Sequence, residues 1–243
     1  MATLFISDLH LDDSRPEVTA LFGRFVDDEA RRADALYILG DLFEAWVGDD
    51  DASAAGDVVA TKLRALSDAG VPVFFMHGNR DFLVGAGYAD RAGMTLLPDP
   101  AVILVEGRPV LLMHGDTLCT DDVAYQAFRA QSRDPKWQAH FLAQPLAARQ
   151  AFADQARAAS KAHQAGLQAA GAMDAITDVA PPTVEATFRR FGIDTLVHGH
   201  THRPAVHPLD IDGRPCRRIV LGDWYEQGSV LRMFADTTDL SVL

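Results

Sequence analysis

Cysteine is scarce in this chain: only Cys119 and Cys216 occur among 243 residues. Two cysteines cannot form a disulfide framework or a four-thiolate zinc site, so both are excluded. Long apolar runs are also missing, and stretches such as Val71–Met76 and Val102–Val105 are far too short to span a bilayer. The amino terminus has no basic segment followed by a long apolar stretch, so we expect no signal peptide. These absences favour a cytoplasmic protein and leave peripheral attachment to a membrane surface open.

Positive charge is in deficit, with 22 Lys and Arg residues against 34 Asp and Glu residues and a net charge of −12. Nucleic-acid binders need clustered Lys and Arg for phosphate contacts, so we expect no nucleic-acid partner. A phosphate-bearing substrate would instead require a local site in which metal cations neutralise the acids. Hydrophobic residues make up 48% of the chain, enough for the core of a single domain over 1–243.

Short runs rich in β-branched and aromatic residues alternate with helical stretches, a pattern typical of a layered α/β fold. Helices are predicted after Pro16, over Val58–Ala69 and from Pro181 to Arg190. The predicted strands are Thr3–Ser7, Ala35–Leu39, Val73–Met76, Thr95–Leu97, Ala101–Val105, Val110–Met113, Thr195–Val197, Ala205–Leu209, Cys216–Leu221 and Ser229–Phe234.

The amino-acid composition changes over 120–171, where strand signals are missing and Ala, Gln, Arg and spaced aromatic residues predominate. This change predicts a helical insertion within the domain. Trp137 and Phe141 are four residues apart, so they can share one helix face. Leu142 and Phe152 add apolar surface nearby.

Polar residues follow five of the predicted strands directly, where open α/β sheets place their ligands. Because residues two apart in an extended chain point the same way, each Asp-x-His or His-x-His pair can bind from one side. The adjoining glycines permit tight turns and a close approach of the backbone. These segments are Asp8-Leu9-His10, Gly40-Asp41, Gly78-Asn79-Arg80, His114-Gly115-Asp116 and Gly199-His200-Thr201-His202.

Together these segments offer seven nitrogen and oxygen ligands, too many for one zinc ion but suited to two metal ions bridged by a carboxylate. Mixed imidazole and carboxylate ligation without thiolate favours Mn, Fe or Zn, and an oxygen-rich set leans towards Mn. We therefore expect two divalent ions, with Mn²⁺ preferred.

The order of these segments resembles that of the calcineurin-like metallophosphoesterases, whose fold is a β-sandwich flanked by helices. The resemblance covers most of the chain. Five stretches are also similar to the UDP-2,3-diacylglucosamine diphosphatases, the pyrophosphate hydrolases of lipid A biosynthesis. These stretches are Leu4–Leu11, Ala35–Trp46, Gly78–Phe82, Met113–Asp122 and His198–Pro204.

The resemblance implies two groups of metal ligands joined by the bridging carboxylate of Asp41. One group consists of Asp8, His10 and His202, and the other of Asn79, His114 and His200. A hydroxide shared by the metals would attack the phosphorus, because metal binding lowers the pKa of water towards ~7. The catalytic residues implied are Asp41, Asn79, Arg80 and His200.

The resemblance also implies a substrate, UDP-2,3-diacylglucosamine, which would be split into UMP and 2,3-diacylglucosamine 1-phosphate at the cytoplasmic face of a bacterial inner membrane. Arg80 stands where most of the wider superfamily has His, and its fork binds phosphate oxygens bidentately. The insertion would form a lid for the acyl chains. The residues expected to bind substrate are Asn79, Arg80, Asp122, Ser160 and His200.

Where the diphosphatases often carry Asn and Lys, this chain has Gln164 and Leu167, so those two contacts are not carried over. A broader phosphodiesterase or phosphatase of the same superfamily stays an alternative, and a scaffold without metals is a second. Asp49-Asp50-Asp51 lacks companion ligands and is interpreted as a solvated loop. His77, His198 and Asp116 fit equally well as partners of the ligands or as structural hydrogen-bonding groups. We expect surface or packing roles for His140, His163 and His207.

Overall fold

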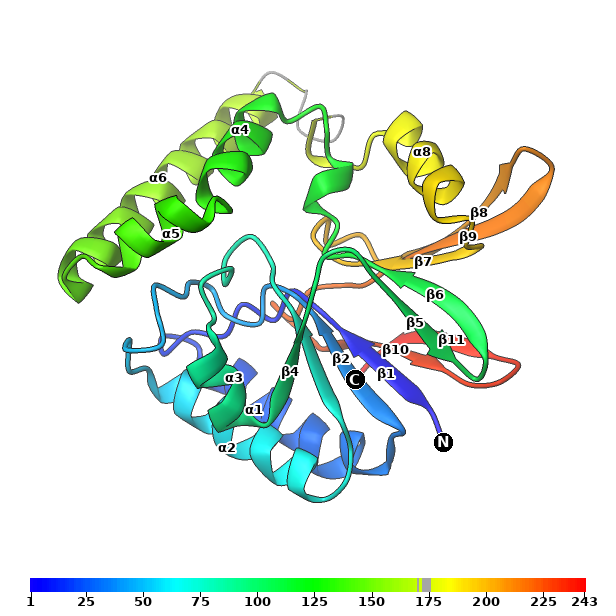
Figure 1. Ribbon diagram of the computed structural model, residues 1–243, viewed down its shortest axis with the longest axis horizontal. Helices are drawn as coiled ribbons and strands as arrows, with labels where there is room; N and C mark the ends of the chain where they lie inside the picture. Colours follow the sequence, from blue (N-terminus) through cyan, green and yellow to red (C-terminus); the bar gives the residue numbers. More distant parts are fainter. Residues whose placement is uncertain (170, 172–175) are drawn as a thin grey trace.

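Two β-sheets packed face to face form the centre of the computed structural model, and helices lie outside them (Figure 1). The structure describes residues 1–169, 171 and 176–243. Buried apolar side chains of both sheets meet between them, among them Phe5 and Leu39 from one sheet and Leu112 and Val197 from the other. The helix-flanked β-sandwich expected from the sequence is confirmed.

The first sheet has six strands in the order β11-β10-β1-β2-β3-β4. Strands β1 to β4 run parallel, and β10 and β11 are added antiparallel at one edge. The parallel strands have buried residues on both faces, as expected for strands covered on both sides. The bounds are β1 Thr3–Ile6, β2 Ala35–Leu39, β3 Val73–Met76, β4 Met94–Leu97, β10 Ser229–Met233 and β11 Thr238–Val242.

The second sheet has five strands in the order β5-β6-β7-β9-β8. Strands β6, β7 and β9 are parallel, while β5 and β8 pair antiparallel with their neighbours. The hairpin between β5 and β6 turns at Glu106 and Gly107, both with positive φ, as a two-residue turn requires. The bounds are β5 Ala101–Val105, β6 Arg108–Leu112, β7 Thr195–His198, β8 Ala205–Ile211 and β9 Arg214–Val220.

Helices α1 (Pro16–Asp28), α2 (Ala54–Asp68) and α3 (Ala86–Ala92) cover the outer face of the six-stranded sheet, and α8 (Pro181–Phe191) covers the other sheet (Figure 1). Local sequence explains their ends: α1 and α8 start with proline, and α8 closes at Gly192 in the left-handed conformation. Strand β11 and helix α3 were not predicted.

Three consecutive helices occupy the segment where an insertion is expected: α4 (Val123–Ser132), α5 (Pro135–Leu142) and α6 (Leu146–Ala169). They lie together beyond the ends of the strands (Figure 1). We call them the three-helix segment; residue 170 of the expected insertion lies outside the described residues. None of the helices that the structure describes is both long and apolar enough to cross a membrane.

One buried arginine on α6 attaches the three-helix segment to the loop before α2. Arg149 is 2% exposed and donates to the Val47 carbonyl and to both carboxylate oxygens of Asp50. A neighbouring carboxylate in that loop, Asp49, accepts the backbone N–H groups of Gly85 and Tyr88 at the start of α3. Asp49 and Asp50 are exposed, as expected, but they also bind protein groups.

Candidate metal centre and substrate cavity

The five polar segments predicted from the sequence meet at the carboxyl ends of β1, β2 and β3 in one sheet and of β6 and β7 in the other. Hydrogen bonds tie the segments together across the sandwich. The Asp8 N–H donates to the Gly40 carbonyl at 3.0 Å, and the His200 N–H donates to Asp8 Oδ2 at 2.9 Å. The Arg80 N–H donates to Asp41 Oδ1 at 2.8 Å. Both sheets therefore contribute to one site.

The backbone at this site adopts a conformation that non-glycine residues rarely take. Five predicted ligands have φ between 49° and 68°, in the left-handed region. The other non-glycine residues with positive φ in the described part of the chain are Glu106 and Asp212, both in hairpin turns. Such strain gathers at functional sites, where the surrounding structure holds it. The five ligands are Asp8, His10, Asp41, His200 and His202.

A first group of ligand atoms is formed by Asp8, His10 and His202, all within 4.8 Å of one another. His10 Nε2 and His202 Nε2 face each other at 3.3 Å, and Asp8 Oδ1 lies 3.3 Å from His202 Nε2. Asp8 and His10 are buried. Two imidazole nitrogens and a carboxylate oxygen aimed at one point match the donor set of a divalent transition metal ion.

A second group converges on the Asn79 side-chain carbonyl. His114 Nε2 lies 3.0 Å and His200 Nδ1 2.9 Å from Asn79 Oδ1. His114 Nδ1 donates to the Leu39 carbonyl at 2.8 Å, so the neutral imidazole in this tautomer offers the Nε2 lone pair that a metal ion needs. Asp8, Asp41 and His114 also offer atoms within 4.8 Å of one another.

Asp41 lies between the two groups. Its Oδ2 is 3.7 Å from His10 Nε2, and its Oδ1 is 3.9 Å from His114 Nε2. Gly78 packs so closely on Asp41 that a Cβ atom there would clash with the carboxylate. A side chain at position 78 would thus displace the residue that faces both groups.

Negative charge dominates the centre. Burial opposes the charged form of His114, yet the nearby carboxylates of Asp41, Asp116 and Asp8 raise its pKa to about 9. Burial likewise opposes the charged form of Asp8, but His202, His114 and His10 hold its pKa well below the ordinary value. The cluster of carboxylates, the left-handed ligand backbone and the buried Oδ1 of Asp8, which accepts no hydrogen bond, all fit two bound divalent cations.

Glu44 and Tyr225 belong to this site although the sequence did not point to them. Glu44 Oε2 lies 3.2 Å from His10 Nδ1, and the Tyr225 ring stacks on His10 with 5.3 Å between ring centroids. The Arg15 guanidinium covers the Tyr225 ring and donates to the His10 carbonyl at 2.6 Å. A carboxylate on the far nitrogen of a ligating imidazole orients it and raises its basicity.

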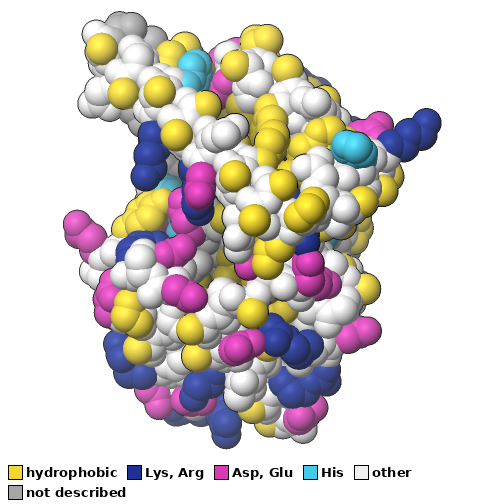
Figure 2. Space-filling view, turned by 90° about the vertical axis from the view of Figure 1, so that its left-hand side faces the viewer, with side chains coloured by type: hydrophobic (Ala, Val, Ile, Leu, Met, Phe, Trp, Pro, Cys, Tyr) yellow, Lys and Arg dark blue, Asp and Glu magenta, His cyan; other side chains and the backbone are white. Residues whose placement is uncertain are grey.

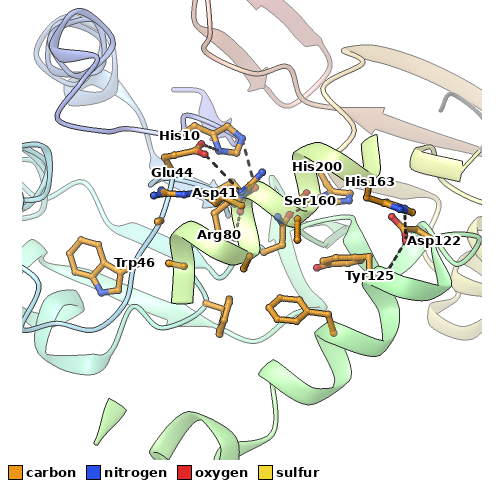
Figure 3. Close-up of a pocket in the computed structure, with 18 of the residues that line it drawn as sticks. His10, Asp41, Glu44, Trp46, Arg80, Asp122, Tyr125, Ser160, His163 and His200 are labelled. Carbon is orange, nitrogen blue, oxygen red and sulfur yellow. Dashed lines mark hydrogen bonds and ion pairs between the residues drawn. The ribbon is translucent and has the colours of Figure 1, made fainter. Parts of the chain in front are cut away.

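A cavity of about 720 Å³ extends from these ligands to the three-helix segment. Figure 3 shows His10, Asp41, Glu44 and Arg80 together at one part of it. Arg80 is a quarter exposed, and its Nη1 lies 3.9 Å from Glu44 Oε1. The volume is typical of a site for a sizeable organic ligand. Aromatic side chains form the apolar wall: Trp46, Phe82, Tyr125, Phe128, Trp137, Phe141 and Phe152.

The predicted substrate residues Asp122 and Ser160 line another part of the cavity, beside His163 (Figure 3). Asp122 caps α4 by accepting the Tyr125 N–H at 3.0 Å, and its Oδ1 lies 3.9 Å from His163 Nε2. His163 is about half exposed but contributes to the cavity, where we expected only a surface or packing role.

The neighbours of the ligands have structural partners. His77 Nε2 donates to the Val84 carbonyl at 2.7 Å. His198 donates from Nδ1 to the Gly199 carbonyl and accepts at Nε2 from Arg218, and burial lowers its pKa to about 3. Asp116 accepts from two side chains of α4. His77 and His198 therefore act as structural hydrogen-bonding groups.

Comparison with known proteins agrees with this geometry. The family model described as calcineurin-like phosphoesterase matches residues 1–204. A protein of Stenotrophomonas maltophilia (strain K279a) named UDP-2,3-diacylglucosamine hydrolase is 63% identical over 245 residues, covering 100% of this chain and 99% of that protein. One of the same name from Xanthomonas oryzae pv. oryzae (strain PXO99A) is 65% identical over 242 residues, covering 99% and 98%. The chain belongs to the calcineurin-like phosphoesterase family and, within it, to the group of proteins that carry this name.

Proposed function

We propose that this protein hydrolyses the pyrophosphate bond of UDP-2,3-diacylglucosamine, giving UMP and 2,3-diacylglucosamine 1-phosphate in lipid A biosynthesis. The observation that carries the proposal is the continuity of the cavity, which joins a cluster of metal-ligand side chains to a long aromatic wall. A substrate with a pyrophosphate and two acyl chains requires both features. The printed names of relatives at 63–65% identity support the same substrate.

The metal centre is proposed to hold two divalent ions, one at Asp8, His10 and His202 and one at Asn79, His114 and His200, with Asp41 shared between them. When bound, such ions polarise phosphoryl oxygens and make water a nucleophile near neutral pH. The mixture of imidazole, carboxylate and amide ligands without thiolate suits Mn, Fe or Zn, and of these Mn²⁺ is proposed. Glu44 would keep the His10 imidazole in place from behind, at 3.2 Å from its Nδ1.

Arg80, Asn79 and His200 are proposed to act on the phosphates. Water adds to one phosphorus while the bridging oxygen leaves with the other phosphate, so negative charge grows on both groups. Arg80 lines the cavity beside Asp41 and can bind phosphoryl oxygens through its guanidinium fork. The Arg80 N–H donates to Asp41 Oδ1, which holds the loop that carries Arg80 beside the metal-ligand side chains.

The three-helix segment is proposed to be a lid that covers the acyl chains, with Asp122 and Ser160 near the glucosamine part. Trp137, Phe141 and Phe152 form one cluster, with 4.9 Å between the first two ring centroids and 5.3 Å between the last two. These rings add to the apolar wall, to which Trp46 and Phe82 contribute from outside the three-helix segment. Burial of an acyl chain there would contribute about 0.8 kcal/mol per CH₂ group.

A place at the cytoplasmic surface of the inner membrane is part of the proposal, because the lipid substrate resides in a bilayer. Val123, Leu142 and Phe152 of the three-helix segment are 73%, 42% and 39% exposed. Figure 2 shows hydrophobic side chains scattered over the upper part of one face, while charged side chains crowd its lower part. Exposed apolar side chains beside the cavity would ease the transfer of acyl chains from the membrane.

The proposal is tested by comparing substrates. Purified protein with added Mn²⁺ should cleave UDP-2,3-diacylglucosamine into the two named products, identified by mass spectrometry, far faster than it cleaves an aryl phosphate or an aryl phosphodiester. Equal rates on all of them would instead support the broader phosphodiesterase or phosphatase. The absence of cleavage with any divalent metal would overturn the enzyme assignment.

A further inference from the structure

One face of α4 carries three side chains at four-residue spacing whose polar ends reach the strand-end loops, and the ring of the first also lines the cavity. They are Tyr125, Arg129 and Arg133, the last being the residue that closes the helix. Positions i, i+4 and i+8 share a helix face. We call this set the polar stripe of α4.

The first two residues of the stripe hold the segment after His114. The Tyr125 hydroxyl and Arg129 Nε both donate to Asp116 Oδ2, the latter at 2.7 Å. Asp116 is fully buried two residues from His114. Gln126, on the same helix, donates to the Asp116 carbonyl at 2.7 Å. Helix α4 thus holds the segment after His114 through both the carboxylate and the backbone carbonyl of Asp116.

The third residue of the stripe holds the segment before Asn79. Arg133 Nη2 donates to the Gly78 carbonyl at 2.7 Å, and its guanidinium lies over the Phe82 ring at 5.1 Å. Gly78 packs against Asp41 and donates its N–H to Asp81 Oδ1 at 2.8 Å. Arg133 therefore fixes the peptide that sets the direction of the Asn79 side chain.

We propose that Arg129 and Arg133 are positioning residues, through which docking of α4 sets the geometry of the second metal-ligand group, Asn79, His114 and His200. The inference rests on the proposed metal centre, and it gives two residues of the three-helix segment a role in positioning the metal ligands. Because coupling between two sites is reciprocal, metal binding should in turn stabilise the docked α4. The Tyr125 ring, 5.9 Å from the His200 ring, brings the third ligand of the group into the same contact.

The second anchor of the three-helix segment supplies a matched control. Arg149 also attaches this segment through its guanidinium, but to Val47 and Asp50, which lie six and nine residues beyond Asp41, and not to a residue beside a ligand of the second group. Replacing each arginine by Met removes one guanidinium and keeps an apolar stem. If attachment of the segment were all that mattered, Arg149→Met would have the same effect on metal binding as Arg129→Met or Arg133→Met.

The experiment is a calorimetric titration of Mn²⁺ alone into chelator-treated protein. Arg129→Met and Arg133→Met should lower the affinity for one of the two Mn²⁺ ions by about 10–100-fold. This is the usual effect of removing a group that orients a ligand. Arg149→Met should stay within threefold of the parent. Wild-type affinity in both stripe variants, or an equal loss in all three variants, would overturn the proposal.

Hydrogen exchange of the unaltered protein keeps the proposal testable if a variant fails to fold. Adding Mn²⁺ should slow amide exchange in α4 by at least tenfold and change α5 and α6 less. If Mn²⁺ leaves the amide exchange rates of α4 unchanged, metal binding is not coupled to the docking of α4. Arg133→Lys, which retains one donor for the Gly78 carbonyl, should recover most of the affinity that Arg133→Met loses. If the parent protein binds no Mn²⁺, the proposed metal centre itself fails, which is a different result.

Discussion

Truncation of Phe128 tests the proposed acyl site without disturbing the core. Phe128 lines the cavity and is half-buried. Phe141 also lines the cavity, but it is 5% exposed and belongs to the buried core, so Phe141→Ala should cost about 3–5 kcal/mol of folding stability. Phe128→Ala is the cleaner perturbation of the apolar wall.

The size of the effect follows from the surface that Phe128 offers to an acyl chain. Complete burial of a phenylalanine side chain contributes about 1.5–3 kcal/mol. At most about a third of that remains to be gained on substrate binding, since the Phe128 side chain is only partly exposed in the free protein. A loss of ~0.5–1 kcal/mol corresponds to about a 2–5-fold rise in KM for the lipid.

The assay compares UDP-2,3-diacylglucosamine with a small soluble phosphodiester, at saturating Mn²⁺. Phe128→Ala should raise KM for the lipid and leave the phosphodiester rate within twofold. The control is Leu104→Ala on β5, because Leu104 is 70% exposed and does not line the cavity. Equal losses on both substrates, or no loss on either, would refute the reasoning.

Four further substitutions, at three positions, test the centre itself. Asp41→Ala should abolish activity and lower metal content without unfolding the chain; metal analysis and circular dichroism check this, and full occupancy with near-normal turnover would contradict the shared-ligand role. Arg80→Ala should keep both metals and lose about 10²–10³-fold in kcat, as when one preorganised charge-stabilising donor is removed. Arg80→Lys should recover little, since a point charge does not reproduce the fork, so near-wild-type turnover would count against bidentate binding. Glu44→Gln should weaken Mn²⁺ binding by about 10-fold in a titration, and unchanged affinity would exclude its role behind His10.

The sequence predicted several of the strands well because their signals are local. Ala35–Leu39, Val73–Met76 and Ala101–Val105 are strands with the bounds expected, since each is a short apolar run between turn or helix signals. Helix α3 was missed because its seven residues, Ala86–Ala92, show little apolar periodicity. Its start is stabilised by Asp49, a carboxylate 36 residues earlier in the chain than Gly85, and no local pattern shows such a contact.

The candidate ligands could be proposed because they follow strand ends, whose positions the hydrophobic pattern reveals. Glu44 could not, because only the packed structure brings its carboxylate to His10. His163 was missed for a related reason. Its ion-pair partner, Asp122, is 41 residues earlier in the chain, and only the folded structure places both residues at the cavity. The four-residue spacing of Tyr125, Arg129 and Arg133 is visible in the sequence, but the acceptors on Asp116 and Gly78 are not.

The most direct test of the account is the metal dependence of product formation. Chelator-treated protein is incubated with UDP-2,3-diacylglucosamine, and Mn²⁺, Mg²⁺, Co²⁺ or Zn²⁺ is added back separately while UMP and 2,3-diacylglucosamine 1-phosphate are quantified. We expect no turnover without metal, the highest rate with Mn²⁺, and the two products in equal amounts. Undiminished hydrolysis after complete removal of metal, or products other than this pair, would contradict a two-metal pyrophosphate hydrolase.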